Sequence, residues 1–134
     1  FLNITRWYSY SRVNRKMAYS TKFQSLADAA RAKVDEVPAQ EVAALMASGA
    51  VALDIRDPDE HAKGHIPGSV NLSRGKLEMN VEDMLPDFET VILCYCNAYN
   101  RGALSAASLR EMGYSNAKFI AGGLNAWRKL QGDA

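Results

Sequence analysis

The sequence predicts an α/β fold with a small, mostly parallel sheet flanked by helices on both faces, and three observations support this prediction. The length of 134 residues fits one domain and allows a core to form without disulfides or metals. The apolar runs AVALDI (50–55) and TVILCYC (90–96) are typical of buried strands. Strand-like and helix-like stretches alternate from about Gln24 onward, which indicates βα units and therefore a parallel sheet.

The elements follow from local patterns in chain order. Residues 25–36 repeat apolar positions near the helical period, and 37–49 begin at Pro38, which suits a first helical turn, and end at Gly49, which suits a helix stop. The later elements are a strand at 50–55, a loop at 56–68 that could hold a helical turn at 60–63, a short strand at 69–73, an irregular helix at 74–85, a turn at 86–89, a strand at 90–96, a helix at 101–113, a strand at 117–121 and a helix at 122–131.

The charge distribution divides the chain in two. Residues 1–27 carry five basic residues and no acidic one, whereas the remainder carries 11 basic and 15 acidic residues, which gives the net charge of +1. We expect residues 1–23 to be a leader or extension, with Met17 as a candidate natural start, and 24–134 to form the domain; a nucleic-acid arm or a transit peptide is the alternative interpretation of the basic segment. The acidic body argues against nucleic acid as a partner.

No membrane partner is expected. The longest nearly apolar stretch, 42–53, is shorter than the roughly 20 residues that a spanning helix needs. The two cysteines, Cys94 and Cys96, are separated by one residue, so a strand would direct both side chains to the same face and they would not pair with each other. Free thiols predict a reducing compartment, here the cytoplasm, and Cys94 is interpreted as a small buried hydrophobe.

The stretch CNAYNR (96–101) joins the most strand-like run to a strong helix and is the candidate active site. Ligands of open α/β sheets bind beyond the carboxyl ends of strands, which is where Cys96 falls. Unpaired N–H groups of the loop, the helix dipole and the Arg101 cation would favour a thiolate and bind an anion beside it. The expected substrate-binding residues are Asn97, Ala98, Tyr99, Asn100, Arg101 and Arg56.

The spacing restricts the anion. Cys96 and Arg101 enclose four residues, whereas the loops of phosphatases and arsenate reductases that use this device enclose five. The shorter loop suits something smaller than a tetrahedral oxyanion, such as the outer sulfur of a persulfide. Arg101 could either contact the substrate or brace the loop, and both interpretations are kept. Arg56 could pair with Asp54 or contact the anion.

Two further motifs flank the loop, and together the three resemble the rhodanese-like sulfurtransferases. LDIRDPDEHAKGHIPGSVNL (53–72) resembles the first signature of that family, and MGYSNAKFIAGGLNAW (112–127) resembles its closing signature. The resemblance implies a single rhodanese-like domain that needs no metal or organic cofactor. It also implies that Cys96 takes sulfur from a donor such as thiosulfate, releases sulfite, and passes the sulfur from a persulfide to cyanide or a thiol, on a small molecule or a protein.

Three residues of the loop region depart from the commonest form of the family. Tyr99 stands where many members have glycine, Gly102 where they have serine or threonine, and Asn97 where they often have a basic residue. A tyrosine with positive φ would cost on the order of 1 kcal/mol. The alternative prediction is therefore a weakly active or inactive protein-binding module of the same fold, with Tyr99 and the aromatic N-terminal segment as contacts.

The remaining polar candidates have structural interpretations. His61 and His65 have the i, i+4 spacing of metal ligands on a helix, but His65 is expected to hydrogen-bond the backbone and His61 to be partly exposed. We expect no metal. Glu60 is expected on the surface or in an ion pair, and Trp127 in the core.

Overall fold

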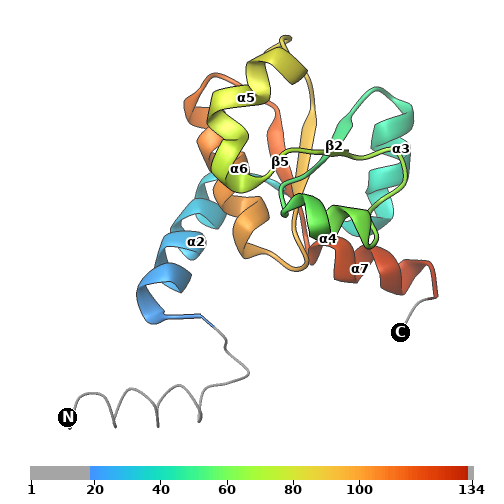
Figure 1. Cartoon of the computed structure of the whole chain (residues 1–134), viewed down its shortest axis with the longest axis horizontal. Coiled ribbons are helices and arrows are strands. Elements are labelled where there is room, and N and C mark those ends of the chain that lie inside the picture. Colours follow the sequence, from blue (N-terminus) through green and yellow to red (C-terminus); the bar gives the residue numbers. More distant parts are fainter. Residues whose placement is uncertain (1–18, 133–134) are drawn as a thin grey trace, which may run out of the picture.

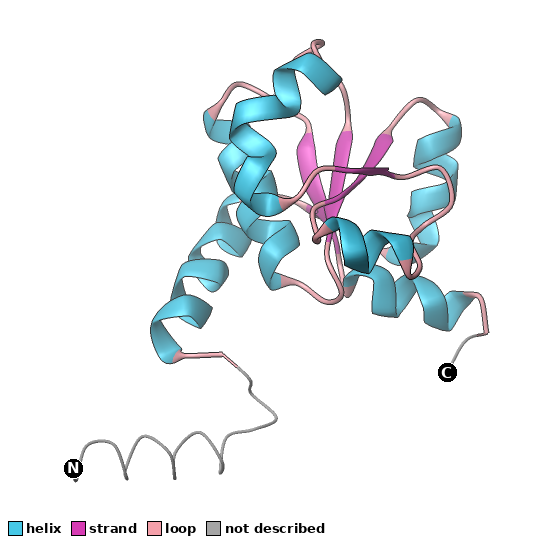
Figure 2. Cartoon of the chain, viewed as in Figure 1, coloured by secondary structure: helices cyan, strands magenta, loops and turns pink. Residues whose placement is uncertain are grey.

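The fold is a five-stranded parallel sheet enclosed by helices, as seen in a computed structural model that describes residues 19–132 (Figures 1 and 2). The strand order is β1-β5-β4-β2-β3 and every neighbouring pair is parallel. The strands are β1 Glu36–Val37, β2 Val51–Asp54, β3 Val70–Asn71, β4 Ile92–Tyr95 and β5 Ala117–Ile120. The predicted α/β class with a parallel sheet is confirmed.

Helices cover both faces of the sheet, also as predicted. They are α2 Thr21–Lys33, α3 Val42–Ala47, α4 Pro58–Ala62, α5 Leu77–Met84, α6 Asn100–Glu111 and α7 Gly123–Leu130, with 3-10 turns at Ala39–Glu41 and Arg74–Lys76. Figure 1 shows α2, α5 and α6 on one side of the strands and α3 and α7 on the other. No helix within residues 19–132 is long and apolar enough to cross a bilayer.

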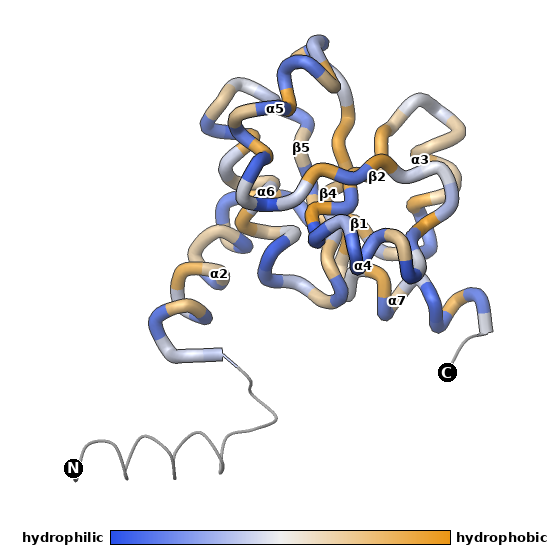
Figure 3. Tube along the Cα trace, in the orientation of Figure 1, coloured by the Kyte–Doolittle hydropathy of each residue, from blue (hydrophilic) through white to orange (hydrophobic). Residues whose placement is uncertain are grey.

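Strand β4 is the centre of the hydrophobic core. Its side chains alternate between the two faces: Ile92 and Cys94 join one buried cluster, and Leu93 and Tyr95 join the other. All four are fully buried. In Figure 3 the central strands are coloured mainly as hydrophobic and lie in the interior of the molecule. Cys96 joins the same cluster as Cys94, so the two free thiols lie on one face, as the strand period predicts.

The N-terminal elements differ from the sequence prediction. Helix α2 begins at Thr21, within the range assigned to the leader, because the Ser20 hydroxyl accepts a hydrogen bond from the Phe23 N–H at 3.3 Å and caps the helix there. The prediction of helix through Glu36 is wrong, since Glu36 and Val37 form β1. This two-residue strand pairs with β5 through Glu36–Phe119 and Val37–Ile120, a tertiary pairing that has no local sequence pattern.

Candidate active site

Cys96 lies at the carboxyl edge of the sheet, directly after β4, and the loop from Cys96 to Arg101 runs into helix α6. The Cys96 residue is only 4% exposed. All six loop residues nevertheless line an open pocket of about 300 Å³. The structure thus brings together every predicted site residue except Arg56, which is not among the residues that line this pocket.

Helix α7 holds the first half of the loop from outside. The N–H of Leu124 donates to the Cys96 carbonyl at 2.8 Å, and the N–H of Asn125 donates to the Asn97 carbonyl at 3.0 Å. In a trans peptide the N–H points opposite to the carbonyl, and no cis bond occurs among the described residues. The N–H groups of Asn97 and Ala98 therefore point away from α7, so hydrogen bonds to α7 do not occupy these two donors.

A glycine makes this close approach feasible. Gly123 has φ +55, and a Cβ atom there would collide with the Cys96 carbonyl oxygen and lie 2.7 Å from the Ala98 carbonyl oxygen. Only a residue without a side chain lets the start of α7 reach the loop. The double glycine of the closing signature is thus part of the support of the loop.

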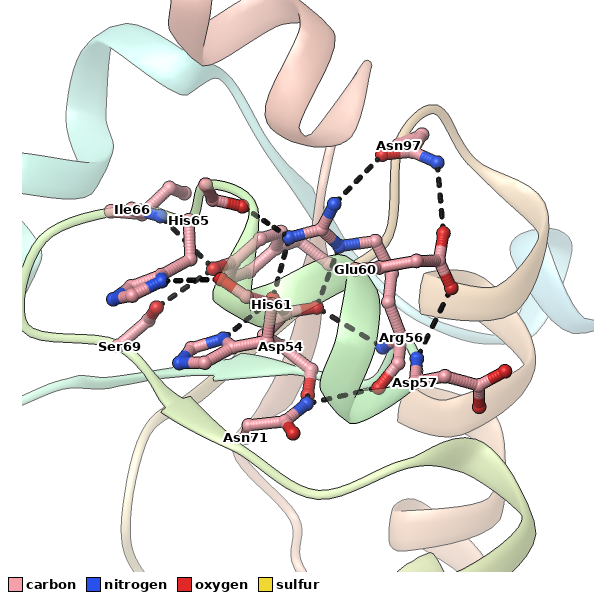
Figure 4. Close-up of polar contacts among 12 residues, drawn as sticks. Asp54, Arg56, Asp57, Glu60, His61, His65, Ile66, Ser69, Asn71 and Asn97 are labelled. Atoms are coloured by element: carbon pink, nitrogen blue, oxygen red, sulfur yellow. Dashed lines mark hydrogen bonds and ion pairs between the residues drawn. The ribbon is translucent and has the colours of Figure 1, made fainter.

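Glu60, at the start of α4, connects the two ends of the loop. Its carboxylate accepts from both terminal nitrogens of Arg101, at 2.9 and 3.1 Å. It also accepts from the Asn97 amide at 3.3 Å, as Figure 4 shows. The hydrogen bonds from Arg101 lower the pKa of Glu60 to about 2, although burial acts in the opposite direction. Since Arg101 is already paired, an anion beside Cys96 would depend mainly on the backbone amides and the dipole of α6.

Arg56 lies behind the loop. It is 4% exposed and donates to both carboxylate oxygens of Asp54, at 2.9 and 2.7 Å, to the Gly64 carbonyl at 2.7 Å and to the Asn97 side-chain oxygen at 3.1 Å. The Asn97 amide is thus fixed between Arg56 and Glu60 (Figure 4). A cation at position 97 could not accept the hydrogen bond from Arg56.

Asp54 anchors Arg56 from the end of β2. The carboxylate is fully buried, and the His61 Nδ1 atom lies 2.8 Å from it. Burial raises the pKa of Asp54, but the hydrogen bonds from Arg56 and His61 outweigh burial, so the pKa lies below its ordinary value. His65 Nδ1 lies 2.7 Å from the His61 carbonyl, and no group of three metal-ligating side chains occurs in residues 19–132.

Helix α2 holds the second half of the loop. Gln24 and Asn100 form a reciprocal pair of amide hydrogen bonds at 3.2 and 3.1 Å. The Arg31 guanidinium lies 3.9 Å from the centre of the Tyr99 ring, a cation–π contact, and Tyr99 also meets Phe119 edge to face. Apart from the helical period of α2, no pattern in the sequence predicts these contacts.

Two of the departures from the common loop have structural explanations. Tyr99 has φ −126°, so the positive φ considered from the sequence does not occur and the tyrosine carries no such strain. Gly102 is buried, and a Cβ there would lie 3.3 Å from the Tyr95 Cα and 3.4 Å from the Cys94 carbonyl oxygen. Glycine at 102 therefore lets α6 pack tightly against β4 behind the loop.

Replacing Glu60 with glutamine is expected to cost about 1 kcal/mol or less at pH 7, because the ion pair with Arg101 is about a third exposed. The pKa of Glu60 is lowered from 4.5 to about 2, so its contribution to stability is complete above the higher value and is lost as the pH falls through the lower one. Urea unfolding of both proteins at pH 7 and pH 3 should show the stability difference shrinking at the lower pH.

Glu78→Gln is the matched control for this prediction. Glu78 also pairs with an arginine, Arg74, at 2.8 Å, but it belongs to α5 and does not line the pocket. Burial raises the pKa of Glu78, but hydrogen bonds from Ser108 and Arg74 outweigh it and lower the pKa, so the stability lost in Glu78→Gln should also shrink at low pH. Only Glu60→Gln should slow a reaction at Cys96. Equal rates in the two variants would show that the Glu60–Arg101 pair does not support the loop.

Comparisons with known proteins agree with this geometry. Residues 38–130 match the family described as Rhodanese-like domain. The thiosulfate sulfurtransferase GlpE of Pseudomonas entomophila (strain L48) is 37% identical over 89 residues, which are 66% of this chain and 80% of that protein. These are matches in sequence and do not depend on the structure.

Solved structures show the same fold. A Rhodopseudomonas palustris protein, RPA3614, described as of unknown function and a possible tyrosine phosphatase, is 29% identical with a TM-score of 0.74, over 81% of this chain and 90% of its own. The human single-domain sulfurtransferase TSTD1 is 27% identical with a TM-score of 0.66, over 72% of this chain and 96% of its own. On the extent of the family match, the chain belongs to the rhodanese-like family.

Proposed function

We propose that this protein is a sulfurtransferase that carries sulfur as a persulfide on Cys96. The observation that carries the proposal is the loop itself. Its cysteine lies at the carboxyl end of β4, and the carbonyl groups of Cys96 and Asn97 point toward α7, which donates hydrogen bonds to them. Relatives named thiosulfate sulfurtransferase, at 37% and 36% identity, support sulfurtransferase activity at the level of the family.

The reaction needs no group beyond the chain and its substrates. The Cys96 thiolate attacks the outer sulfur of thiosulfate, the S–S bond of the donor breaks, and sulfite leaves with the bonding electrons. The outer sulfur of the new persulfide carries the negative charge, and the N–H groups of the loop would stabilise it. A thiolate or cyanide then attacks that sulfur and regenerates the Cys96 thiolate. Free thiols suit a reducing compartment such as the cytoplasm.

Two alternative functions are less well supported. The protein-binding module uses Tyr99 and the aromatic N-terminal segment as contacts. The Tyr99 ring packs against Arg31 and Phe119, and the segment before Tyr19 lies outside the described residues. Phosphatase chemistry is disfavoured by a loop with four residues between the cysteine and the arginine. Hydrolysis of an aryl phosphate that is lost in Cys96→Ser would restore the phosphatase interpretation.

The experiment that tests the proposal is intact mass spectrometry of the reduced protein after brief treatment with thiosulfate and then with cyanide. We expect a gain of about 32 Da, one sulfur atom, that cyanide removes, because the persulfide is the covalent intermediate. No gain on folded, reduced protein from thiosulfate or from an organic persulfide would contradict the proposal.

A further inference from the structure

Helix α2 forms one wall of the pocket that contains Cys96. Tyr19, Phe23, Gln24 and Arg31 line it opposite the loop. None of these residues falls in the matched range 38–130, so the wall lies outside the part of the chain that defines the family. Figure 1 shows α2 beside α6, the helix that the loop enters.

The wall is held in place by specific contacts. Ala27 and Ala30 are buried, so α2 approaches α6 through small side chains. The Gln24–Asn100 amide pair links the helix directly to the loop, and Arg31 covers the ring of Tyr99 seven residues further on, on the same face of α2. The position of the wall relative to Cys96 is therefore defined by hydrogen bonds and packing.

The wall has an apolar part and a polar part. The rings of Tyr19 and Phe23 lie 5.3 Å apart and form an apolar strip, and Tyr19 is 52% exposed. Next to this strip are the backbone of the loop 97–101 and two arginines that already have carboxylate partners, Arg31 with Glu36 and Arg101 with Glu60. This combination suits an anion that also carries an apolar group.

The size of the pocket also favours an anion that carries an organic group. Its volume, about 300 Å³, is at the lower limit of sites that hold organic ligands, which begin at about 300 Å³. Thiosulfate is a small inorganic anion without apolar surface, and it would leave the aromatic strip uncovered. An organic group attached to the same sulfur would cover the strip and remove apolar surface from water.

We propose that Phe23 and Tyr19 form a subsite for the organic group of a sulfur donor, so that this protein prefers organic thiosulfonates to thiosulfate. The inference rests on the proposed function for its reaction. The Cys96 thiolate attacks the outer sulfur of R–SO₂–S⁻, the S–S bond of the donor breaks, and the sulfinate R–SO₂⁻ leaves with the electron pair. The R group remains against the aromatic strip throughout.

Benzenethiosulfonate tests the preference, with thiosulfate as the reference donor. In Phe23→Ala the ratio of kcat/KM for benzenethiosulfonate to that for thiosulfate should fall by about tenfold or more, as for other losses of apolar contact in a pocket. Leu26→Ala is the matched control. Leu26 is on the same helix, is 62% exposed and does not line the pocket, so its ratio should stay that of the unaltered protein.

Binding of benzenesulfonate, which has no sulfane sulfur, separates the subsite from the chemistry. Isothermal titration should show binding to the unaltered protein, affinity about tenfold weaker in Phe23→Ala, and no change in Leu26→Ala. Absence of binding, or equal affinity in all three proteins, would overturn the subsite even if Cys96 forms a persulfide. Failure of persulfide formation with Phe23-dependent binding would leave the subsite standing and contradict the proposed function alone.

Discussion

Cys96→Ser is expected to abolish sulfur transfer, with a loss of at least about a thousandfold, because removing a covalent nucleophile leaves only the contribution of binding. A serine hydroxyl cannot form a persulfide, and the other thiol, Cys94, is fully buried and does not line the pocket. Donor consumption in steady state and intact mass after thiosulfate treatment both measure the effect. Chemical denaturation should show that the variant remains folded.

The neighbouring cysteine gives this prediction a matched control. Cys94 lies two residues upstream on the same face of the sheet and is fully buried. Burial raises the pKa of its thiol, so Cys94 stays protonated and unreactive at neutral pH. Cys94→Ala should lose about 1–2 kcal/mol of stability from the small cavity and keep its activity. Sulfur transfer that survives in Cys96→Ser and disappears in Cys94→Ala would reverse the assignment.

Gly123→Ala is expected to have the largest effect on stability. An alanine at φ +55 costs about 1–2 kcal/mol, and displacing the loop carbonyls that its Cβ meets adds the cost of overpacking, about 1–3 kcal/mol. The loop must move to relieve the collision, so turnover should also fall, by about a hundredfold for a shift on the order of 1 Å. Urea unfolding and steady-state kinetics measure the two effects.

Gly49→Ala isolates the backbone part of this cost. Gly49 has φ +109, a conformation no easier for alanine than +55, and a Cβ there would meet nothing within 4 Å. Its variant should lose about 1–2 kcal/mol and keep full turnover. If both variants lose equal stability and neither loses turnover, the contact between α7 and the loop has no part in catalysis.

The central elements were predictable because their patterns are local. A few consecutive residues are enough to identify the buried strands β2 and β4 and the helix α6. β1 could not be found in this way, since two residues carry no period and the pairing of Val37 with Ile120 is tertiary. The start of α2 at Thr21 differs from the prediction because the basic composition of residues 1–23 indicates a leader, whereas Ser20 caps the helix there.

The loop was predictable and its supports were not. Cys96 and Arg101 lie in one short stretch, so their spacing can be recognised directly. The contacts that hold the loop come from far along the chain: Gln24 meets Asn100 across 76 residues, and Glu60 meets Arg101 across 41. Neither pair shares a local pattern. The expectation that Glu60 lies on the surface or in an ion pair is confirmed, but its partner, Arg101, could not be identified from the sequence.

The hydrogen bonds from α7 have a consequence for the newly synthesised chain. Synthesis runs from the N-terminus, so Cys96 leaves the ribosome before Leu124 and Asn125, whose N–H groups hold the carbonyls of the loop. Until α7 has emerged, Cys96 is present without the two hydrogen bonds that position the carbonyls of Cys96 and Asn97. A chain that ends before α7 therefore lacks this support of the loop, whatever the rest of the sheet has already formed.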